Sequence, residues 1–339
     1  MRAATYRQTG PAADVLDVAA HPQPEPGPGE VLVRVMASGI NPADVKRRGG
    51  WNGARMEHAL VIPHCDGAGV IEAVGAGVAR DRIGQRVWMW NAQGGYGESG
   101  RAFGTAAEYI ALASAQAVPL SDTLGFDEGA CLGVPGLTAW LAVLGDGDVA
   151  GRTLLIQGAA GAVGQMCVQV AAAAGARVIA TVSNAEAAET VRRLGAGVAI
   201  DRHAEDVADA VATATGGAGV DRIVEVDLAA NLETDIACLA PGGMIASYSC
   251  SSDPTPVLPY YALANLGARI RFVQGFRLTD AERREAEAMI ARLTDAGQLC
   301  PQIGARYPLE DIAAAHQRVE SGAAGQTVLF PISQDRSPT

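Results

Sequence analysis

The stretch "TLLIQGAAGAVGQMCVQVAAAAGARVIATVS", from Thr153 to Ser183, decides the fold of this chain. A short apolar run is followed by a segment made almost entirely of Gly and Ala. A long Ala-rich segment follows, and a second apolar run closes the stretch. Strand, glycine turn, helix and second strand in this order are typical of a parallel β-α-β unit.

The same alternation continues on the C-terminal side. Further strands are predicted at "VAIDR", "RIVEVD", "MIASYS" and "RIRFVQGF", with helices that end in Gly between them. A long helix, "TDAERREAEAMIARLTDAG", is expected to follow with Thr279 as its N-cap. Strands that alternate with helices must pair in parallel through right-handed crossovers. The prediction is an α/β fold with a Rossmann-type, doubly wound parallel sheet.

Residues 1–120 have a different pattern, with short strands between glycines and a Pro-rich connector at 22–30. "VLVRVMASGI" alternates and is expected to break at Gly39. Residues 307–332 predict one more helix and a closing strand that returns to the first domain. The expected domains are therefore 1–123 with 301–339, and 124–300. Because open α/β sheets bind ligands beyond the carboxyl ends of their strands, the active site is expected in the cleft between the domains.

The glycine turn reads A-x-G-x-x-G, and its residues are Ala159, Ala160, Gly161, Ala162, Val163 and Gly164. Gly161 is expected to let a diphosphate approach the backbone, and Gly164 to let the helix pack closely on the strand. The helix N-terminus then offers N–H groups to the anion. The alternative is a purely structural turn, which the surrounding β-α repeats disfavour.

The end of the second strand predicts NADPH rather than NADH. Folds that prefer NAD place Asp or Glu there to bind the ribose 2′-hydroxyl, and this chain has Val182, Ser183 and Asn184. Arg202 follows the third strand, and either reaches the 2′-phosphate or lies on the surface. Arg192 and Arg193 are interpreted as a solvated helix face.

Bulk composition excludes several classes of partner. The 339 residues are 49% hydrophobic and 19% charged, with a net charge of -11, so nucleic acid and anionic membranes are poor partners. The sequence contains no apolar run of about 18 residues, and neither a membrane span nor a secretory segment is expected. Six scattered cysteines predict reduced thiols in a cytoplasmic protein.

Six motifs together resemble the zinc-independent medium-chain dehydrogenases/reductases, specifically the quinone oxidoreductase branch that includes zeta-crystallin. In chain order they are "VLVRVMASGINPADVKRRG", "GAGVIEAVG", "GTAAEYIAL", "GVPGLTAW", "GAAGAVG" and "APGGMIASYS". The resemblance covers residues 1–331. It implies a GroES-like, β-rich catalytic domain, NADPH-dependent reduction of quinones or other conjugated carbonyls, and a homodimer or homotetramer.

The resemblance also bears on metal binding. It puts Asn41, Cys65 and Val134 at the catalytic zinc-ligand positions of the zinc-dependent relatives, and Val has no donor atom. The four closely spaced cysteines of a structural zinc site are missing, since Cys65 is the only cysteine before Cys131. His64, Cys65 and Asp66 are consecutive, and because successive strand residues point to opposite faces, the three are expected to converge poorly on a metal. No metal is predicted.

By the same resemblance, Asn41 in "GINPAD" faces the nicotinamide ribose and the substrate, where its N–H₂ group donates to an oxyanion or to a ribose hydroxyl. The alternative is an Asn in a turn before Pro42. Asp44 and Lys46 belong to the same candidate catalytic motif. Lys46 stands where the family often has Tyr, and it either binds an anionic substrate, donates a proton or is a surface lysine.

Other residues are expected to line the coenzyme and substrate sites. By strand-end logic and the resemblance, the coenzyme contacts are Val134, Thr138, Asp227, Ser247, Tyr248, Ser249, Phe272 and Gln274. Flat side chains that suit a planar quinone are Trp51, Trp90, Tyr96 and Phe103. His316, in the last helix, is interpreted as a surface or interface residue.

The predicted function is NADPH-dependent reduction of quinones or other α,β-unsaturated carbonyls by direct hydride transfer without zinc. Two alternatives stay open: an enoyl-thioester or enone reductase of a dedicated pathway, and a non-catalytic NADPH-binding protein. A homodimer is expected because the sixth strand, "RIRFVQGF", lies at a sheet edge, and exposed edges are usually paired or blocked.

Overall fold

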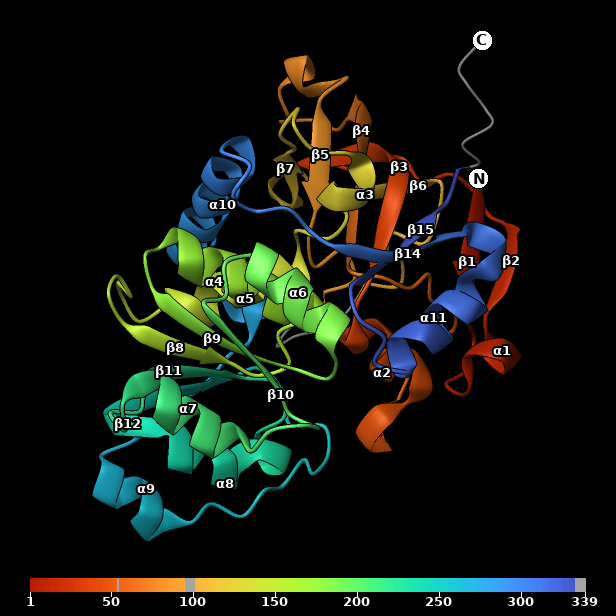
Figure 1. Ribbon diagram of the computed structural model, residues 1–339. Coiled ribbons are helices and arrows are strands. Elements are labelled where there is room, and N and C mark those ends of the chain that lie inside the picture. The colour runs from red at the N-terminus through yellow and green to blue at the C-terminus, as the bar shows by residue number, and fades with distance from the viewer. Residues whose placement is uncertain (54, 95–100, 333–339) are drawn as a thin grey trace. The chain divides into compact units, whose positions relative to one another are not determined.

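The structure is a computed structural model that describes residues 1–53, 55–94 and 101–332 (Figure 1). The chain forms two compact units: Met1–Val134 together with the residues from Ile290 onward, and Pro135–Met289. These boundaries differ from the predicted 123/124 and 300/301. Helix α3 (Phe126–Gly129) contacts strands β3 and β4 of the first unit, so that unit extends beyond residue 123.

The second unit contains a six-stranded sheet with the order β10-β9-β8-β11-β12-β13, and each neighbouring pair is parallel. This is the 3-2-1-4-5-6 order of the Rossmann fold, which confirms the predicted fold class. The predicted sixth strand, β13, lies at one edge. The strands are β8 (Thr153–Ile156), β9 (Arg177–Val182), β10 (Val198–Asp201), β11 (Val220–Glu225), β12 (Leu239–Ser247) and β13 (Arg269–Phe272).

Helices connect these strands, and the core beneath them contains apolar residues from five of the six strands, β8 to β12, such as Leu155, Ile179 and Ile223. Thr279 caps the last helix, since its Oγ1 accepts from Glu282 N at 3.3 Å, as predicted. The helices are α4 (Val134–Val143), α5 (Ala162–Ala173), α6 (Ala185–Arg193), α7 (Val207–Thr215), α8 (Leu228–Cys238), α9 (Tyr260–Leu266), η4 (Gly275–Arg277) and α10 (Asp280–Asp295).

The first unit contains a sheet with the order β14-β15-β3-β4-β5-β7, and β6 also pairs with β3. Strand β15 pairs antiparallel with β3, so the C-terminal segment returns to the first unit as predicted (Figure 1). The strands of this sheet are β3 (Glu30–Ile40), β4 (Asp66–Val74), β5 (Arg86–Met89), β6 (Tyr109–Ala113), β7 (Ala117–Pro119), β14 (Ile303–Pro308) and β15 (Gln326–Phe330). A separate two-stranded sheet is formed by β1 (Arg2–Thr5) and β2 (Asp17–Ala20).

The predicted break at Gly39 is wrong, because β3 continues through it to Ile40. A Cβ atom on residue 39 would lie 2.0 Å from the carbonyl oxygen of Ala130. The glycine is therefore needed for a close approach of two backbones and not to end the strand. This approach also fixes the segment after α3 against the end of β3.

Short helices complete the first unit. Helix α11 covers a core that contains Ile40, Val45 and Leu329, so it ties the C-terminal segment to the start of α2. The helices are α1 (Ala12–Val15), α2 (Pro42–Gly49), α11 (Ile312–Glu320), η1 (Trp51–Gly53), η2 (Arg80–Arg82), η3 (Ser114–Gln116) and η5 (Leu309–Asp311). Within the described ranges, no helix has the length and apolar character that crossing a membrane requires.

Candidate functional site

Asn41 and Asp66 form the centre of a buried polar cluster in the first unit. Asn41 is the N-cap of α2, at the end of β3, and Asp66 is the first residue of β4. Asn41 Nδ2 donates to Asp66 Oδ2 at 2.8 Å, and the backbone N–H of Val134 donates to the same oxygen at 2.7 Å. The carboxylate therefore fixes which end of the Asn41 amide faces it, and one N–H of that amide remains.

Burial shapes the electrostatics of Asp66. Desolvation raises its pKa well above the usual range, and the nearby Asp44 raises it further. Asp66 Oδ1 has no donor among the described residues. A Cβ on Gly133 would lie 2.2 Å from this oxygen, so only glycine lets the chain pass so close to the carboxyl group.

Asp44 holds the backbone of the cluster together. Its Oδ2 accepts from Asn41 N at 2.8 Å and its Oδ1 from Cys65 N at 3.2 Å. Burial raises the pKa of Asp44 to about 6, against the opposing effect of the Asn41 hydrogen bond. Asp44 is thus placed to orient Asn41, and both of its oxygens are engaged by backbone amides.

Lys46 lies on the second turn of α2, and its Nζ is 4.9 Å from the centre of the Trp51 ring. It is the only lysine of the chain, against 25 arginines. Trp51 is 43% exposed, so the cation–π contact is at the surface of the first unit. The structure therefore places an ammonium group and a flat ring together, five and ten residues after Asn41.

His316 is not a surface residue, and the sequence-based interpretation is wrong. It is fully buried, and its Nε2 lies 2.9 Å from His64 Nε2. Helix α11 packs onto the first-unit core, and this carries His316 inward. Desolvation lowers the pKa of His316 to about 3 and that of His64 well below 6.5. Both rings are neutral at pH 7, and one donates to the other.

A hydroxyl pair continues this contact toward Asp66. His64 Nδ1 lies 2.8 Å from Ser38 Oγ, which is 2.8 Å from Thr105 Oγ1. Thr105 Oγ1 in turn donates to the Asp66 carbonyl at 2.5 Å. His64 has a φ of 81°, so it does not extend β4 backwards, and the assumption of a regular strand across 64–66 is wrong.

The remaining aromatic residues of the first unit have different settings. Phe103 is 51% exposed and forms a β-bridge with Ile62. Trp90 is half-buried beside Gln116, whose Nε2 donates to the Trp90 carbonyl at 3.1 Å. Tyr96 lies outside the described residues. Trp51, in contrast, contacts Lys46 of α2.

The glycine turn of the second unit has the predicted place between β8 and α5. Gly161 is the N-cap of α5. A Cβ on Gly164 would lie 2.4 Å from the Gly158 carbonyl oxygen, so Gly164 packs the helix onto the turn. Gly158 has a φ of 62°, which favours glycine. Ala159 is fully buried, and its N–H donates to Thr181 O at 2.9 Å. Ala162 and Val163 begin the first turn of α5.

The first-turn N–H groups of a helix lack intrahelical acceptors, so this turn fits an anion such as a diphosphate. A Cβ on Gly161 would meet only Gly158 O, at 3.3 Å, which leaves the outer side of the turn open. The turn lies at the carboxyl end of β8, next to the ends of β9 and β11. This is the position at which Rossmann sheets hold a dinucleotide.

Ser183, Asn184 and Arg202 are exposed at the ends of β9 and β10. Asn184 is committed to capping, because its Oδ1 accepts from Ala187 N at 2.9 Å. The backbone N–H of Arg202 donates to Val182 O at 3.0 Å, so the two strand ends adjoin. Asp201 pairs with Val182 in the sheet. A carboxylate therefore lies beside the end of β9, the position where folds that prefer NAD carry Asp or Glu and this chain has Val182.

Residues at the ends of β11 and β12 form a hydrogen-bonded loop. The Asp227 carboxylate accepts from Ser252 N at 3.0 Å and from Ser252 Oγ at 2.8 Å. Ser247 Oγ donates to Ser249 O at 3.0 Å, and Tyr248 N donates to Glu225 O at 3.0 Å. These predicted contacts therefore share one sheet end with the glycine turn.

Three further predicted residues lie at α4, β13 and η4. Thr138 is buried against η4, and a Cβ on Gly275 would lie 2.6 Å from Thr138 Oγ1. Phe272 is 71% exposed on β13, and Gln274 is exposed at the start of η4. Gly275 is therefore needed to bring η4 onto α4.

The three positions that correspond to zinc ligands meet around one carboxylate. Asn41 and Val134 both donate to Asp66, and Cys65 precedes Asp66 in the chain. In the part of the chain that the structure describes, no group of three His, Cys, Asp or Glu side chains is placed to hold a metal ion. This donor set does not fit a zinc ion with three protein ligands.

Sequence reasoning missed several polar residues that the structure makes central. Asp66 was considered only for metal binding, and Thr181 and Gln157 carry no local motif. Asp235 had a signal, because it occupies the apolar stripe of α8 that includes Leu228 and Leu232. A carboxyl group at an apolar helix position points to a buried partner.

Comparisons with known proteins agree with this architecture. Residues 27–122 match the alcohol dehydrogenase GroES-like domain, and residues 162–295 match the domain described as zinc-binding dehydrogenase. The two units thus define a medium-chain dehydrogenase or reductase.

Curated relatives specify the branch. The quinone oxidoreductase of Lama guanicoe is 34% identical over 312 residues, which cover 91% of this chain and 90% of that protein. The chain therefore belongs to the medium-chain quinone oxidoreductase family and is an oxidoreductase.

Solved structures are similar along the whole chain. A structure described as an NAD-dependent alcohol dehydrogenase has a TM-score of 0.88 and 31% identity, covering 97% of this chain and 99% of its own. A mycobacterial protein complexed with NADPH has a TM-score of 0.84 and 28% identity, covering 98% and 100%.

Proposed function

We propose that this chain reduces quinones or other α,β-unsaturated carbonyls with NADPH, by direct hydride transfer without a metal. The observation that carries the proposal is the glycine turn. It joins β8 to α5 at the carboxyl end of a parallel sheet with the 3-2-1-4-5-6 order. The similar mycobacterial structure that contains NADPH supports the choice of coenzyme.

The bound dihydronicotinamide supplies the hydride, and the chain's own residues supply binding, orientation and electrostatics. In the proposed site, Asn41 donates its remaining amide N–H to the oxygen on which negative charge develops. Asp66 orients the Asn41 side chain by accepting from its amide, and Asp44 holds the Asn41 backbone by accepting from its N–H. A quinone or enone accepts hydride readily because the charge delocalises, and this makes a metal unnecessary.

The proposed coenzyme contacts are those expected from the sequence. Gly161 and Gly164 let the diphosphate and the helix approach, and Ser183 and Arg202 take the 2′-phosphate. The negative charge of Asp201 repels a 2′-phosphate and so opposes a preference for NADPH. In this proposal the attraction between Arg202 and the 2′-phosphate is stronger than that repulsion. Strand-end residues, among them Asp227 and Tyr248, complete the site.

Lys46 and Trp51 favour a second candidate function. An ammonium group 4.9 Å from an exposed indole ring suits an acceptor with a carboxylate or phosphate tail. An enone or enoyl-thioester reductase would use such a pair, whereas a neutral quinone would need only the ring. The third alternative, a non-catalytic NADPH-binding protein, requires coenzyme binding without turnover.

A steady-state assay tests these functions. NADPH oxidation is measured with 1,4-benzoquinone, a neutral enone, an anionic enone and a saturated alcohol as separate substrates. Turnover of quinone and enone but not of alcohol is expected. Binding of NADPH without turnover of any acceptor would favour the non-catalytic alternative, and stoichiometric zinc required for turnover would overturn the metal-free mechanism.

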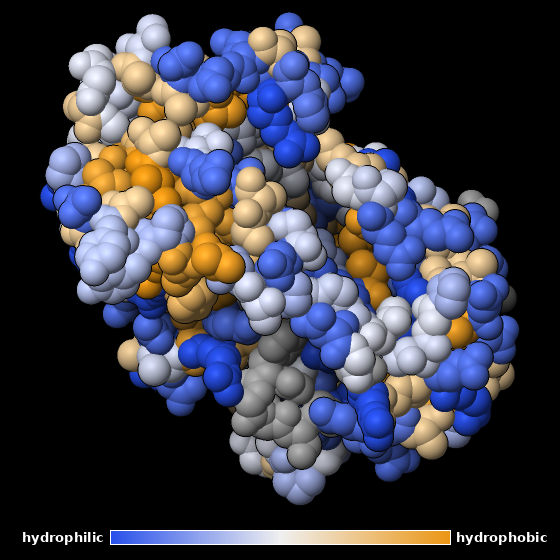
Figure 2. All heavy atoms as spheres, turned by 90° about the horizontal axis from the view of Figure 1, so that it is seen from below, coloured by the Kyte–Doolittle hydropathy of each residue, from blue (hydrophilic) through white to orange (hydrophobic). Residues whose placement is uncertain are grey.

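We also propose that the protein is a homodimer that pairs through β13 of the second unit. Large exposed apolar side chains gather near this edge: Val257, Leu258, Tyr260, Tyr261 and Phe272. Figure 2 shows an extended hydrophobic area on the side where Figure 1 places α9. Contiguous apolar patches on a protein surface mark interaction sites, and an unpaired strand edge can add a partner strand.

A further inference from the structure

Two carboxyl groups lie against each other beneath the glycine turn of the second unit. Glu225 is the last residue of β11, and Asp235 is on α8, the helix that follows. Both side chains are fully buried. Asn231, which donates to Glu225, lies one helical turn before Asp235 on α8, so the two carboxyl groups are neighbours, and each affects the pKa of the other. A hydrogen bond between two carboxyl groups requires a proton on one of them.

The other contacts show which oxygens are occupied. Glu225 Oε1 accepts from Asn231 Nδ2 at 2.9 Å and also from the backbone N–H of Asp227. Asp235 Oδ1 accepts from Gln157 Nε2 at 3.0 Å. Glu225 Oε2 and Asp235 Oδ2 have no hydrogen-bond partner among the described residues. One proton held between these carboxyl groups supplies the missing donor.

The pair is connected to the glycine turn through the side chains of Gln157 and Thr181. Gly158 N donates to Thr181 Oγ1 at 3.0 Å, so the hydroxyl proton of Thr181 goes to Gln157 Oε1, at 2.8 Å. This fixes the Gln157 amide with its N–H₂ toward Asp235. Because Ala159 N also donates to Thr181 O, one threonine holds two successive amides of the turn.

We propose that Glu225 and Asp235 share one proton and act as positioning residues for the glycine turn, so that loss of this proton weakens coenzyme binding. The inference rests on the proposed function, because the turn is taken as the diphosphate site. Neither carboxyl group touches the coenzyme in this arrangement. They act through Gln157 and Thr181.

The surroundings of the pair support the shared proton. Burial raises the pKa of Asp235 to about 9, and the charge of Glu225 adds to this rise. Burial also raises the pKa of Glu225 against its hydrogen bonds. The titratable groups that face the pair directly or through one neighbour are all acids: Asp227, Tyr248, Cys238, Cys167 and Asp206.

Loss of the proton has a direct structural consequence. Two adjacent buried carboxylates repel each other in a medium of low dielectric constant, and no ion pair with a described Lys, Arg or His compensates either of them. Separation of the carboxylates pulls Asp235 away from Gln157 and so releases Thr181 and the Gly158 amide. The second negative charge also opposes the bound diphosphate.

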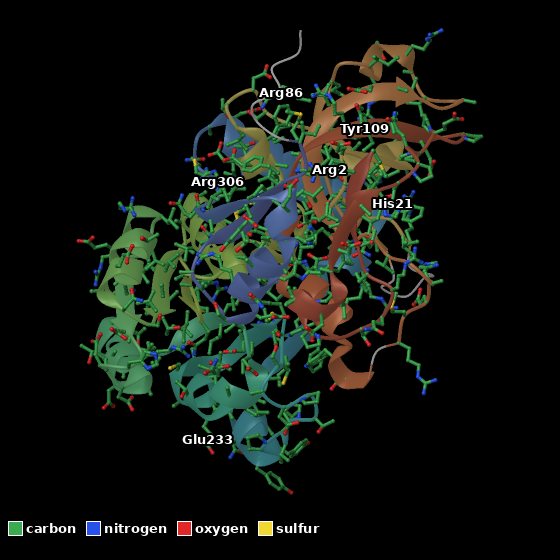
Figure 3. All side chains as sticks on the ribbon, turned by 90° about the vertical axis from the view of Figure 1, so that its right-hand side faces the viewer. Arg2, His21, Arg86, Tyr109, Glu233 and Arg306 are labelled. Atoms are coloured by element: carbon green, nitrogen blue, oxygen red, sulfur yellow. The ribbon has the colours of Figure 1, made fainter. Side chains whose placement is uncertain are left out.

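The test compares the pH dependence of NADPH binding in three proteins. Asp235→Asn keeps an acceptor for Gln157 and gives Glu225 a permanent donor, so its network needs no proton. Glu233→Gln removes a carboxyl group from the exposed side of the same helix, where Figure 3 marks it, and serves as the matched control. The Kd for NADPH is measured by calorimetry between pH 7 and pH 10.

The wild type and Glu233→Gln are expected to lose at least about fivefold in affinity over this range. Asp235→Asn is expected to change by less than about twofold. Equal losses in all three proteins, or a constant Kd in the wild type, would overturn the inference. Glu225→Gln is the second variant if Asp235→Asn does not fold, and it should likewise flatten the profile.

An infrared spectrum separates this inference from the proposed function. In the coenzyme-free protein at pH 7, the band of a protonated carboxyl group should be present in the wild type and reduced in Asp235→Asn. Absence of that difference overturns the shared proton. Failure to bind NADPH or NADH at pH 7 overturns the proposed function instead, and normal binding at pH 7 with a pH-independent Kd overturns the inference alone.

Discussion

Asn41 Nδ2 donates to Asp66 Oδ2 across 2.8 Å, and both side chains are buried. A backbone amide, Val134 N, donates to the same oxygen. The pair therefore fixes an amide donor where the resemblance expects the reacting carbonyl. By the resemblance, two of these residues, Asn41 and Val134, stand at zinc-ligand positions of the zinc-dependent relatives, and here both donate to the carboxyl group of Asp66.

Removal of the amide is the first prediction. Asn41→Ala should lower kcat with quinone by about 100-fold, because loss of one oxyanion donor typically costs that much. Asn41→Asp should be as poor, since a carboxylate cannot donate and would face Asp66. Steady-state kinetics measure both variants. A kcat within about threefold of the wild type in Asn41→Ala would contradict the assigned role.

Coenzyme selectivity is the second prediction. Arg202→Ala should raise KM for NADPH by about tenfold and leave KM for NADH nearly unchanged, because only NADPH carries the 2′-phosphate. Arg193→Ala, which removes a cation from the exposed side of α6, is the matched control and should change neither value. A tenfold preference of the wild type for NADH would show the assignment of NADPH to be wrong.

Lys46 provides the third prediction. Lys46→Met should raise KM about tenfold for an enone that carries a carboxylate, and leave KM for the matched methyl ester unchanged. Because Lys46 is the only lysine, reductive methylation with labelled formaldehyde gives one side-chain NMR signal besides the N-terminus. A shift of that signal on addition of the anionic enone is expected. No shift would exclude Lys46 as the recognition group.

The buried histidines predict an acid-sensitive stability. Burial lowers the pKa of His316 from about 6.5 in the unfolded chain to about 3 in the folded state, so the unfolded chain binds more protons between these pH values. The free energy of unfolding should therefore fall as pH falls from 6.5 toward 3. The slope that His316 contributes approaches about 1.4 kcal/mol per pH unit.

Urea unfolding between pH 4 and pH 7.5 measures this slope. His316→Gln should make it shallower, whereas substitution of the exposed His203 by Gln should leave it unchanged. The same steepness in His316→Gln and in the wild type would contradict the buried, neutral His64–His316 pair.

Dimer formation is the fifth prediction. Phe272→Glu together with Tyr260→Glu places charges on the apolar area around β13 and α9. Sedimentation should then change from a particle of about twice 34.7 kDa to the 34.7 kDa monomer. A wild type that sediments only as the monomer would remove the proposed interface.

Much of this structure follows from local sequence rules. Apolar runs separated by helices that end in glycine predicted every strand of the Rossmann sheet, because parallel strands buried on both faces are almost continuously apolar. The pattern 159–164 likewise predicted the turn, since helix packing leaves no room for a Cβ on Gly164. The short strands of the first unit have a weaker hydrophobic periodicity, so their fold was predicted mainly from the resemblance to the family.

Long-range contacts were beyond the reach of the sequence. Gly39 was read as a strand end because its partner, the Ala130 carbonyl, is 91 residues away. The burial of His316 could not be predicted, because its partner His64 is 252 residues away in the sequence. Asp235 and Gln157 are 78 residues apart in the chain and are hydrogen bonded in the fold. In each case a distant partner, and not the local pattern, sets the role of the residue.

The pairing of β15 with β3 has a consequence for biosynthesis. β3 is synthesised long before β15, the strand that pairs with it. The Rossmann unit, which lies between them in the chain, can fold while the β15-facing edge of β3 is still unpaired. We expect the nascent chain to expose that edge of β3 until translation ends, so that chaperones can bind there. Completion of the first unit is then limited by chain termination and loop closure, rather than by its own hydrophobic collapse.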